Sequence, residues 1–250
     1  GLFLYDLLAL FRSPRTHRKV PKSKVTSLLQ NGLKSVFSYF DYWTDNARLT
    51  LENIIDGHEH GGIALNYSKV INVTKEPDGK FEIELTDGIK FKSRKVFNAT
   101  GPDSDLMRKN IRYCKNENQL EPTKGVHIVV AKNRLSVDSA YTLTVPDDER
   151  VAFVIPWTSN TIIGTTDTFT KDSQDKAFVT KEDVKYLLKY ANHFFPDANL
   201  TESDVISSWV GLRPLVKPES NMSAGKVSRE EKLWFEPEGC LHMIGGKLTT

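Results

Sequence analysis

Four apolar runs follow one another through the middle of the chain, and each has the length of a strand. They span residues 125–130, 140–145, 151–157 and 161–167. Short runs rich in Val, Ile and Thr are typical of β-strands. Because the four runs are successive, the pattern predicts a meander and therefore a mostly antiparallel sheet.

The segment before these runs has a different order. Residues 36–42 have the aromatic density of a strand, residues 47–55 follow the period of a helix, and residues 63–67 form a buried-looking apolar run. The helix places three apolar side chains on one face, those of Leu51, Ile54 and Ile55. Strand, helix, strand is the order of a βαβ unit, so this segment predicts part of a parallel sheet.

Turn and cap signals predict the other elements. Pro77-Asp78-Gly79-Lys80 predicts a hairpin between residues 69–74 and 81–85. Thr180 followed by acidic residues predicts the start of a helix that runs to Phe195. The remaining predicted elements are helices at residues 2–10 and 25–33, a loop at 12–22, and strands at 90–96, 205–215, 232–235 and 240–244.

Composition narrows the class of protein. Among 250 residues, 39% are hydrophobic and 26% charged, as in a folded globular protein. The 34 Lys and Arg nearly balance 32 Asp and Glu, so the net charge of +2 predicts no general attraction to nucleic acid. Cys114 and Cys240 lack metal-ligand spacing, which predicts free, packed thiols and no metal site. The basic stretch from Arg12 to Lys22 is either a solvated loop or a contact with anionic phospholipid or a phosphate.

Neither end of the chain resembles a natural terminus. The apolar start at Gly1 is too short for a membrane span and lacks the features of a signal peptide. Residues 245–250 stop inside a Gly-rich turn. We therefore expect the sequence to be an internal part of a longer polypeptide, here termed the complete protein.

Two turns allow the backbone to approach a ligand closely. Asn98-Ala99-Thr100-Gly101-Pro102 closes a strand, and Gly245 to Thr250 follows another and contains the cation Lys247. Taken alone, each of these turns can also be explained as a structural turn that binds no ligand.

Three side chains of the second half are candidates for chemistry. His127 lies in an apolar strand, where it is either a core residue or a catalyst. Arg213 lies between apolar neighbours and needs a partner anion, either Asp167 or a substrate. Arg229 follows a loop rich in Ser, Lys and Gly and is either solvated or an anion-binding residue.

The ordered occurrence of these segments resembles the FAD-dependent glycerol-3-phosphate dehydrogenases over nearly the whole chain. The segments that carry the resemblance are Tyr39-Phe40-Asp41, Asp45 to Leu49, Asn98 to Pro102, Lys124 to Ile128, Ile155-Pro156-Trp157, Gly164 to Thr168, Ser208 to Leu215 and Gly245 to Thr250. The family's opening Gly-rich dinucleotide fingerprint is absent from the sequence. We therefore expect the isolated chain to be inactive and without FAD.

The resemblance implies oxidation of sn-glycerol 3-phosphate to dihydroxyacetone phosphate, with electrons passing through FAD to a quinone or another membrane acceptor. It implies that His127 is the base or orients the reacting hydroxyl, and that Arg213 stabilises charge on the reacting oxygens. Arg229 and Lys247 would bind the phosphate, and Thr249 is a weaker candidate for hydrogen bonding to flavin or substrate. The implied cofactor-binding residues are Val70, Ala99, Thr100, Gly101, Gly246, Lys247 and Leu248.

The expected fold is α/β with α+β character. It combines a partial FAD-binding nucleotide fold with a mostly antiparallel substrate-binding sheet and flanking helices. The expected boundaries assign residues 1–102 to the FAD domain, 103–235 to the substrate domain and 236–250 to the FAD domain again.

Two rival functions are left open by the residues. One is a related flavin oxidase of amino acids or 2-hydroxy acids, which needs a carboxylate-binding Arg but no gathering of cations. The other is a non-catalytic interaction domain that docks through Arg12 to Lys24. Convergence of His127, Arg213 and Arg229 in one cleft would favour a dehydrogenase of a phosphate ester over both rivals. The family further implies a cytoplasmic protein held peripherally at the inner membrane, with the oligomeric state open.

Overall fold

The computed structural model describes residues 1–9, 14–21, 23, 25, 35–111, 117–145, 150–218, 227, 229–236 and 239–246. The helix predicted at residues 25–33 lies almost entirely outside the described residues, as do Cys114, Lys247, Leu248 and Thr249. The chain forms two compact units, which are described separately. Unit 1 comprises Gly1–Asp45, His127–Thr166 and Val179–Trp209, and unit 2 comprises Asn46–Val126, Asp167–Phe178 and Val210–Thr250. The boundaries predicted at residues 102 and 235 concern cofactor and substrate binding, and they stay predictions.

The main sheet of unit 1 is antiparallel, as predicted. Strand β10 (Asn160–Gly164) pairs with β9 (Val151–Trp157) and with β7 (Thr123–Ala131), and β9 pairs with β8 (Tyr141–Thr144). Strand β12 (Val205–Arg213) also pairs with β7, and both strands continue from one unit into the other.

The predicted meander is wrong at one connection, because β7 pairs with β10 and not with the next strand, β8. The link between β7 and β8 is too long for a hairpin turn. It buries Leu135 and Val137 completely or nearly so, and the Leu135 carbonyl accepts a hydrogen bond from Thr161 Oγ1 at 2.7 Å. Packing of this link therefore carries the chain to the far edge of the sheet.

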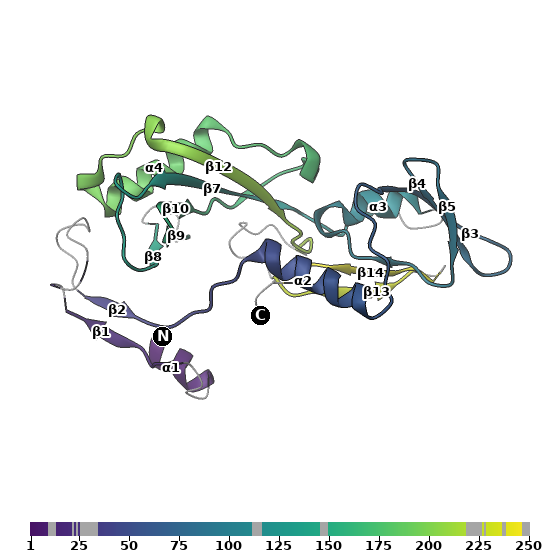
Figure 1. The fold of residues 1–250 in the computed structure, drawn as a ribbon, viewed down its shortest axis with the longest axis horizontal. Coiled ribbons are helices and arrows are strands. Elements are labelled where there is room, and N and C mark those ends of the chain that lie inside the picture. The colour runs from purple at the N-terminus through teal and green to yellow at the C-terminus, as the bar shows by residue number, and fades with distance from the viewer. Residues whose placement is uncertain are drawn as a thin grey trace. The chain divides into compact units, whose positions relative to one another are not determined.

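Helix α4 (Lys181–Phe194) packs against the sheet of unit 1 (Figure 1). Its start is the predicted cap: Thr180 and Asp183 form a reciprocal capping box. Tyr190 packs with Val145 and Ala152 in one buried cluster.

The amino-terminal part of unit 1 contains α1 (Leu2–Leu8) and an antiparallel pair, β1 (Arg18–Val20) and β2 (Val36–Ser38). Strand β1 lies inside the segment predicted as a loop. Its pairing with β2 corrects that prediction, since ladder hydrogen bonds outweigh the local preference of a basic stretch for solvent.

The predicted βαβ unit is wrong. Helix α2 (Asn46–Glu59) forms in unit 2 but buries none of its residues. Residues 63–67 form no strand: Ile63 is 86% and Tyr67 99% exposed, and Tyr67 has a φ of 55°. A left-handed residue cannot continue an extended strand, and no apolar contact compensates for it.

The hairpin of unit 2 is confirmed. Strands β3 (Val70–Lys75), β4 (Phe81–Leu85) and β5 (Lys90–Ser93) form an antiparallel sheet, and Gly79 takes the left-handed conformation in the first turn. Their buried side chains form a core with Ile111 and Cys240. The Cys240 side chain is fully buried, as predicted for a packed thiol.

A second sheet of unit 2 joins distant parts of the chain. Strand β14 (Leu241–Ile244) pairs antiparallel with β13 (Lys232–Phe235) and parallel with β6 (Phe97–Asn98). The remaining described elements are α3 (Ser104–Asn110), β11 (Thr168–Phe169) and the 3-10 turns Gly101–Asp103, Gln174–Lys176, Pro196–Ala198 and Glu202–Asp204.

In the described part of the chain no helix is long and apolar enough to cross a membrane.

Candidate active site

Two arginines meet at one aspartate in unit 2. Arg213, at the end of β12, donates from Nη1 to Oδ1 of Asp167 at 3.2 Å. Arg229 donates from Nη2 to Oδ2 of the same carboxylate at 3.5 Å. The Asp167 side chain is 8% exposed, that of Arg213 24% and that of Arg229 40%. The structure therefore brings together two of the three cations predicted to gather, and Asp167 is one of the two partners that the sequence left open for Arg213.

This cluster keeps an excess of positive charge. Burial lowers the pKa of the Arg213 guanidinium, attraction to Asp167 opposes the shift, and repulsion from Arg229 adds to it. Arginine nevertheless stays charged at neutral pH. One carboxylate between two guanidinium groups leaves a net positive site, with Arg229 as its more exposed member.

A strand glycine creates the space that Arg213 occupies. A Cβ on Gly125 would lie 2.6 Å from both Nη1 and Nη2 of Arg213. Any Cβ at this position would require the guanidinium to shift. Glycine inside a strand weakens it and often marks such a close approach, so the backbone of β7 forms the floor beneath the guanidinium.

A second strand glycine serves His127 in unit 1. Gly164 is the cross-strand partner of His127, and a Cβ on Gly164 would lie 2.1 Å from His127 Cδ2. The imidazole stacks on Trp209, with ring centroids 5.0 Å apart and an interplanar angle of 9°. His127 is half-buried, so it is held by a ring on one side and a bare backbone on the other rather than enclosed in the core.

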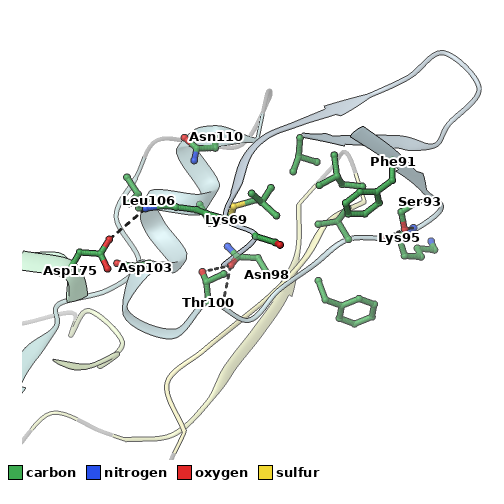
Figure 2. A pocket seen from close by; sticks show the side chains of 17 residues that line it. Lys69, Phe91, Ser93, Lys95, Asn98, Thr100, Asp103, Leu106, Asn110 and Asp175 are labelled. Carbon is green, nitrogen blue, oxygen red and sulfur yellow. Dashed lines mark hydrogen bonds and ion pairs between the residues drawn. The ribbon is translucent and has the colours of Figure 1, made fainter. Parts of the chain in front are cut away.

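A pocket of about 520 Å³ in unit 2 is lined by the turn after β6 (Figure 2). Val70, Asn98 and Thr100 line it, together with Lys69 and Asp175, whose charged groups lie 3.7 Å apart. Asn98 Oδ1 accepts a hydrogen bond from Thr100 Oγ1 at 2.7 Å, which closes the turn on itself (Figure 2). Gly101, which follows Thr100, has a φ of 57°, a left-handed conformation that favours glycine.

The predicted site residues lie in unit 2, in unit 1 or outside the described residues. In unit 2, Arg213 and Arg229 converge on Asp167, and Val70 and Thr100 line one pocket. His127 belongs to unit 1, so its place beside the arginines stays a prediction. Gly246 has a left-handed φ of 81°, and Ala99 precedes Thr100 in the pocket turn. Lys247, Leu248 and Thr249 lie outside the described residues, and their predicted roles stay predictions.

Sequence reasoning missed three residues that shape these sites. Asn98 fixes the pocket turn, Gly125 admits Arg213, and Gly164 admits His127. Gly125 lies inside β7 and Gly164 is the last residue of β10, and a glycine in a strand is a signal for close approach of a neighbouring group. That signal does not say which group approaches.

Comparisons with known proteins agree with this geometry. The family model for FAD dependent oxidoreductases (DAO) matches residues 5–247. The chain is 35% identical to an aerobic glycerol-3-phosphate dehydrogenase of Staphylococcus saprophyticus over 259 residues, covering 100% of the chain and 46% of the relative. The chain thus spans about half the length of the curated relatives it matches.

Solved structures give the same answer for the fold. The crystal structure of glycerol-3-phosphate dehydrogenase from Bacillus halodurans complexed with FAD is 33% identical with a TM-score of 0.78, covering 93% of this chain and 47% of that one. Iminodiacetate oxidase from Chelativorans sp. BNC1, at 17% identity and a TM-score of 0.64 over 92% of this chain and 58% of its own, supports the fold alone. These findings confirm the predicted fold class and the family resemblance. The chain belongs to the FAD dependent oxidoreductase family.

Proposed function

We propose that the complete protein oxidises sn-glycerol 3-phosphate to dihydroxyacetone phosphate with FAD as its cofactor. The observation that carries the proposal is the pair of arginines on Asp167, because it leaves a net positive site beside a buried carboxylate. A monocarboxylate substrate requires one arginine, whereas a phosphate dianion suits two or more. The names of the relatives support the same substrate.

The described residues fit a dinucleotide cofactor. The pocket turn exposes Thr100 at the end of a strand that pairs parallel with β14, and ligands of nucleotide folds bind outside the carboxyl ends of parallel strands. Val70 and Thr100 would contact the cofactor there, with Ala99 and Gly101 giving close backbone approach. When bound, FAD supplies the acceptor for the two electrons and the hydrogen that leave the substrate carbon.

The side chains of this chain would do the remaining work. Arg229, with Lys247, would hold the phosphate, and Arg213 would stabilise negative charge on the reacting oxygen. His127 would take the proton of the C2 hydroxyl. Gly125 and His127 are two residues apart on β7, and strand periodicity predicts that such residues share a face.

The final acceptor and the location of the protein belong to the same proposal. A quinone or another membrane acceptor would reoxidise the cofactor, and the protein would be cytoplasmic with a peripheral contact at the inner membrane. The basic residues Arg15, Arg18 and Lys19, all described and exposed or partly exposed, suit an anionic membrane surface. Binding to vesicles with and without anionic lipid would test this part separately.

The central experiment is substrate-dependent reduction of the complete protein. We expect glycerol 3-phosphate to bleach the flavin absorbance and to support reduction of a quinone analogue. Amino acids and 2-hydroxy acids should leave the flavin oxidised. Bleaching by an amino acid or a 2-hydroxy acid, with none by glycerol 3-phosphate, would contradict the proposal.

A further inference from the structure

A buried chain of polar side chains lies behind the pocket turn in unit 2. It joins β6, α3, β13 and β14, and its members have no role in the function proposed above. Their exposed fractions are Asn98 2%, Ser104 0%, Arg108 3%, Glu236 7% and His242 0%. Burial of so many polar groups is costly unless each finds a partner, so their arrangement is constrained.

One end of this chain is anchored by charge. Arg108 donates to Glu236 Oε1 at 2.8 Å and to Asp105 Oδ1 at 3.2 Å. Trp234 Nε1 donates to the same Glu236 oxygen at 3.2 Å. Burial alone would raise the pKa of Glu236, but the hydrogen bonds from Arg108 and Trp234 outweigh it and hold that pKa below its ordinary value.

The near end of the chain is the side-chain amide of Asn98. Its Nδ2 donates to the Ser104 carbonyl at 3.0 Å and lies 3.0 Å from His242 Nδ1. Its Oδ1 accepts from Thr100, from Oγ1 at 2.7 Å and from the backbone N–H at 3.4 Å. Asn98 and Thr100 both line the pocket, where Figure 2 shows their contact.

The direction of these hydrogen bonds follows from donor chemistry. A backbone carbonyl only accepts, so the amide nitrogen of Asn98 must face Ser104. The same nitrogen faces His242, whose Nδ1 must therefore accept. His242 is then neutral, with its proton on Nε2.

We infer that His242 is a positioning residue for the cofactor: its neutral ring holds the Asn98 amide, and Asn98 in turn holds the Thr100 turn that lines the cofactor pocket. The ring is fixed in place by stacking on Trp234, with centroids 5.1 Å apart and an interplanar angle of 21°. This inference rests on the proposed function, because it takes the pocket as part of the FAD site.

The test compares three variants of the complete protein. His242→Phe keeps a stacked ring but removes the acceptor, so we expect the Kd for FAD to rise about tenfold, as for an unmade buried hydrogen bond. His242→Asn carries an oxygen near the position of Nδ1 and should restore the Kd to within about threefold of the wild type. Trp234→Phe keeps an aromatic ring to stack on His242 and removes the hydrogen bond from Nε1 to Glu236. It should lower the melting temperature and leave the Kd unchanged.

Three outcomes would overturn the inference. The first is an equal loss of FAD affinity in His242→Phe and Trp234→Phe, since that reports general damage to the unit. The second is a wild-type His242 ring that carries its proton on Nδ1 at neutral pH, measured by ¹⁵N NMR of histidine-labelled protein. The third is a Kd for FAD that His242→Phe leaves unchanged. The NMR measurement needs no variant to fold. A complete protein that binds no FAD would refute the proposed function itself, whereas tight binding that His242→Phe leaves unchanged would refute only the positioning role.

Discussion

Gly125→Ala should damage the active site without a direct change to any charged group. The new Cβ would lie 2.6 Å from both terminal nitrogens of Arg213, well short of an ordinary contact at 3.4 Å. The neighbouring atoms are the planar end of a side chain that also bonds Asp167. Relief of the clash therefore requires the guanidinium to move by about 0.8 Å, and that displacement stretches a 3.2 Å hydrogen bond beyond its useful range.

The size of the effect follows from the bond that is lost. A hydrogen bond between charged groups contributes about 1.5 to 3 kcal/mol. Arg213 is about one quarter exposed, with 24% of its side chain accessible, so we take the lower limit. A loss of about 1.5 kcal/mol corresponds to roughly a tenfold fall in kcat/KM. Because Arg213 is proposed to act at the reacting oxygen, glycerol 3-phosphate and glycerol should be affected alike.

Gly211→Ala is the matched control. Gly211 is also a strand glycine, on β12, but a Cβ built there meets no atom of the described residues within 4 Å. Steady-state kinetics of both variants of the complete protein, with thermal unfolding measured beside them, would separate local displacement from loss of fold. Full activity in Gly125→Ala, or an equal loss in the two variants, would refute the argument that β7 forms the floor of the arginine site.

Four further predictions concern His127, the proposed phosphate contact and the buried chain behind the pocket turn. Gly164→Ala would place a Cβ 2.1 Å from the His127 ring and should slow flavin reduction in stopped-flow experiments. His127→Gln removes the proposed general base and should lower the rate of flavin reduction about 100-fold to 10,000-fold. An unchanged rate in His127→Gln would show that His127 has only a structural role. Arg229→Ala should lower kcat/KM for glycerol 3-phosphate about ten- to hundredfold and leave glycerol nearly unaffected, so equal losses for both substrates would contradict a phosphate contact. The pKa of Glu236 lies below its ordinary value of 4.5, so this carboxylate stabilises the fold above about pH 4.5 and its contribution is lost as the pH falls through the lowered value; urea unfolding between pH 6 and pH 3 should show a smaller pH dependence for Glu236→Gln than for the wild type.

Local chemistry was enough to predict several elements of this fold. The cap at Thr180 and the turn around Gly79 form as expected, because each depends on a few adjacent residues. The pairing of β7 with β10 was not predictable in the same way. It depends on burial of Leu135 in a connection whose path only tertiary packing decides.

The failure at residues 63–67 has a related cause. An apolar run predicts a strand only if another strand and an apolar surface receive it. In unit 2 the run is exposed, and Tyr67 takes a left-handed conformation that ends any extended segment. The period of apolar residues shows which side chains a segment can bury. It does not show which other segment of the sequence packs against them.

The need for an anion beside Arg213 was predictable, because a guanidinium between apolar neighbours requires one, but the sequence left Asp167 and a substrate both open. The sequence did not predict that Arg213 and Arg229 would share Asp167. Two guanidinium groups near each other repel, and in the absence of a substrate the repulsion would drive Arg213 and Arg229 apart. Asp167 holds both of them and neutralises only one charge. A site arranged in this way keeps its shape without a ligand and still attracts an anion, which is what a phosphate-binding site needs before its substrate arrives.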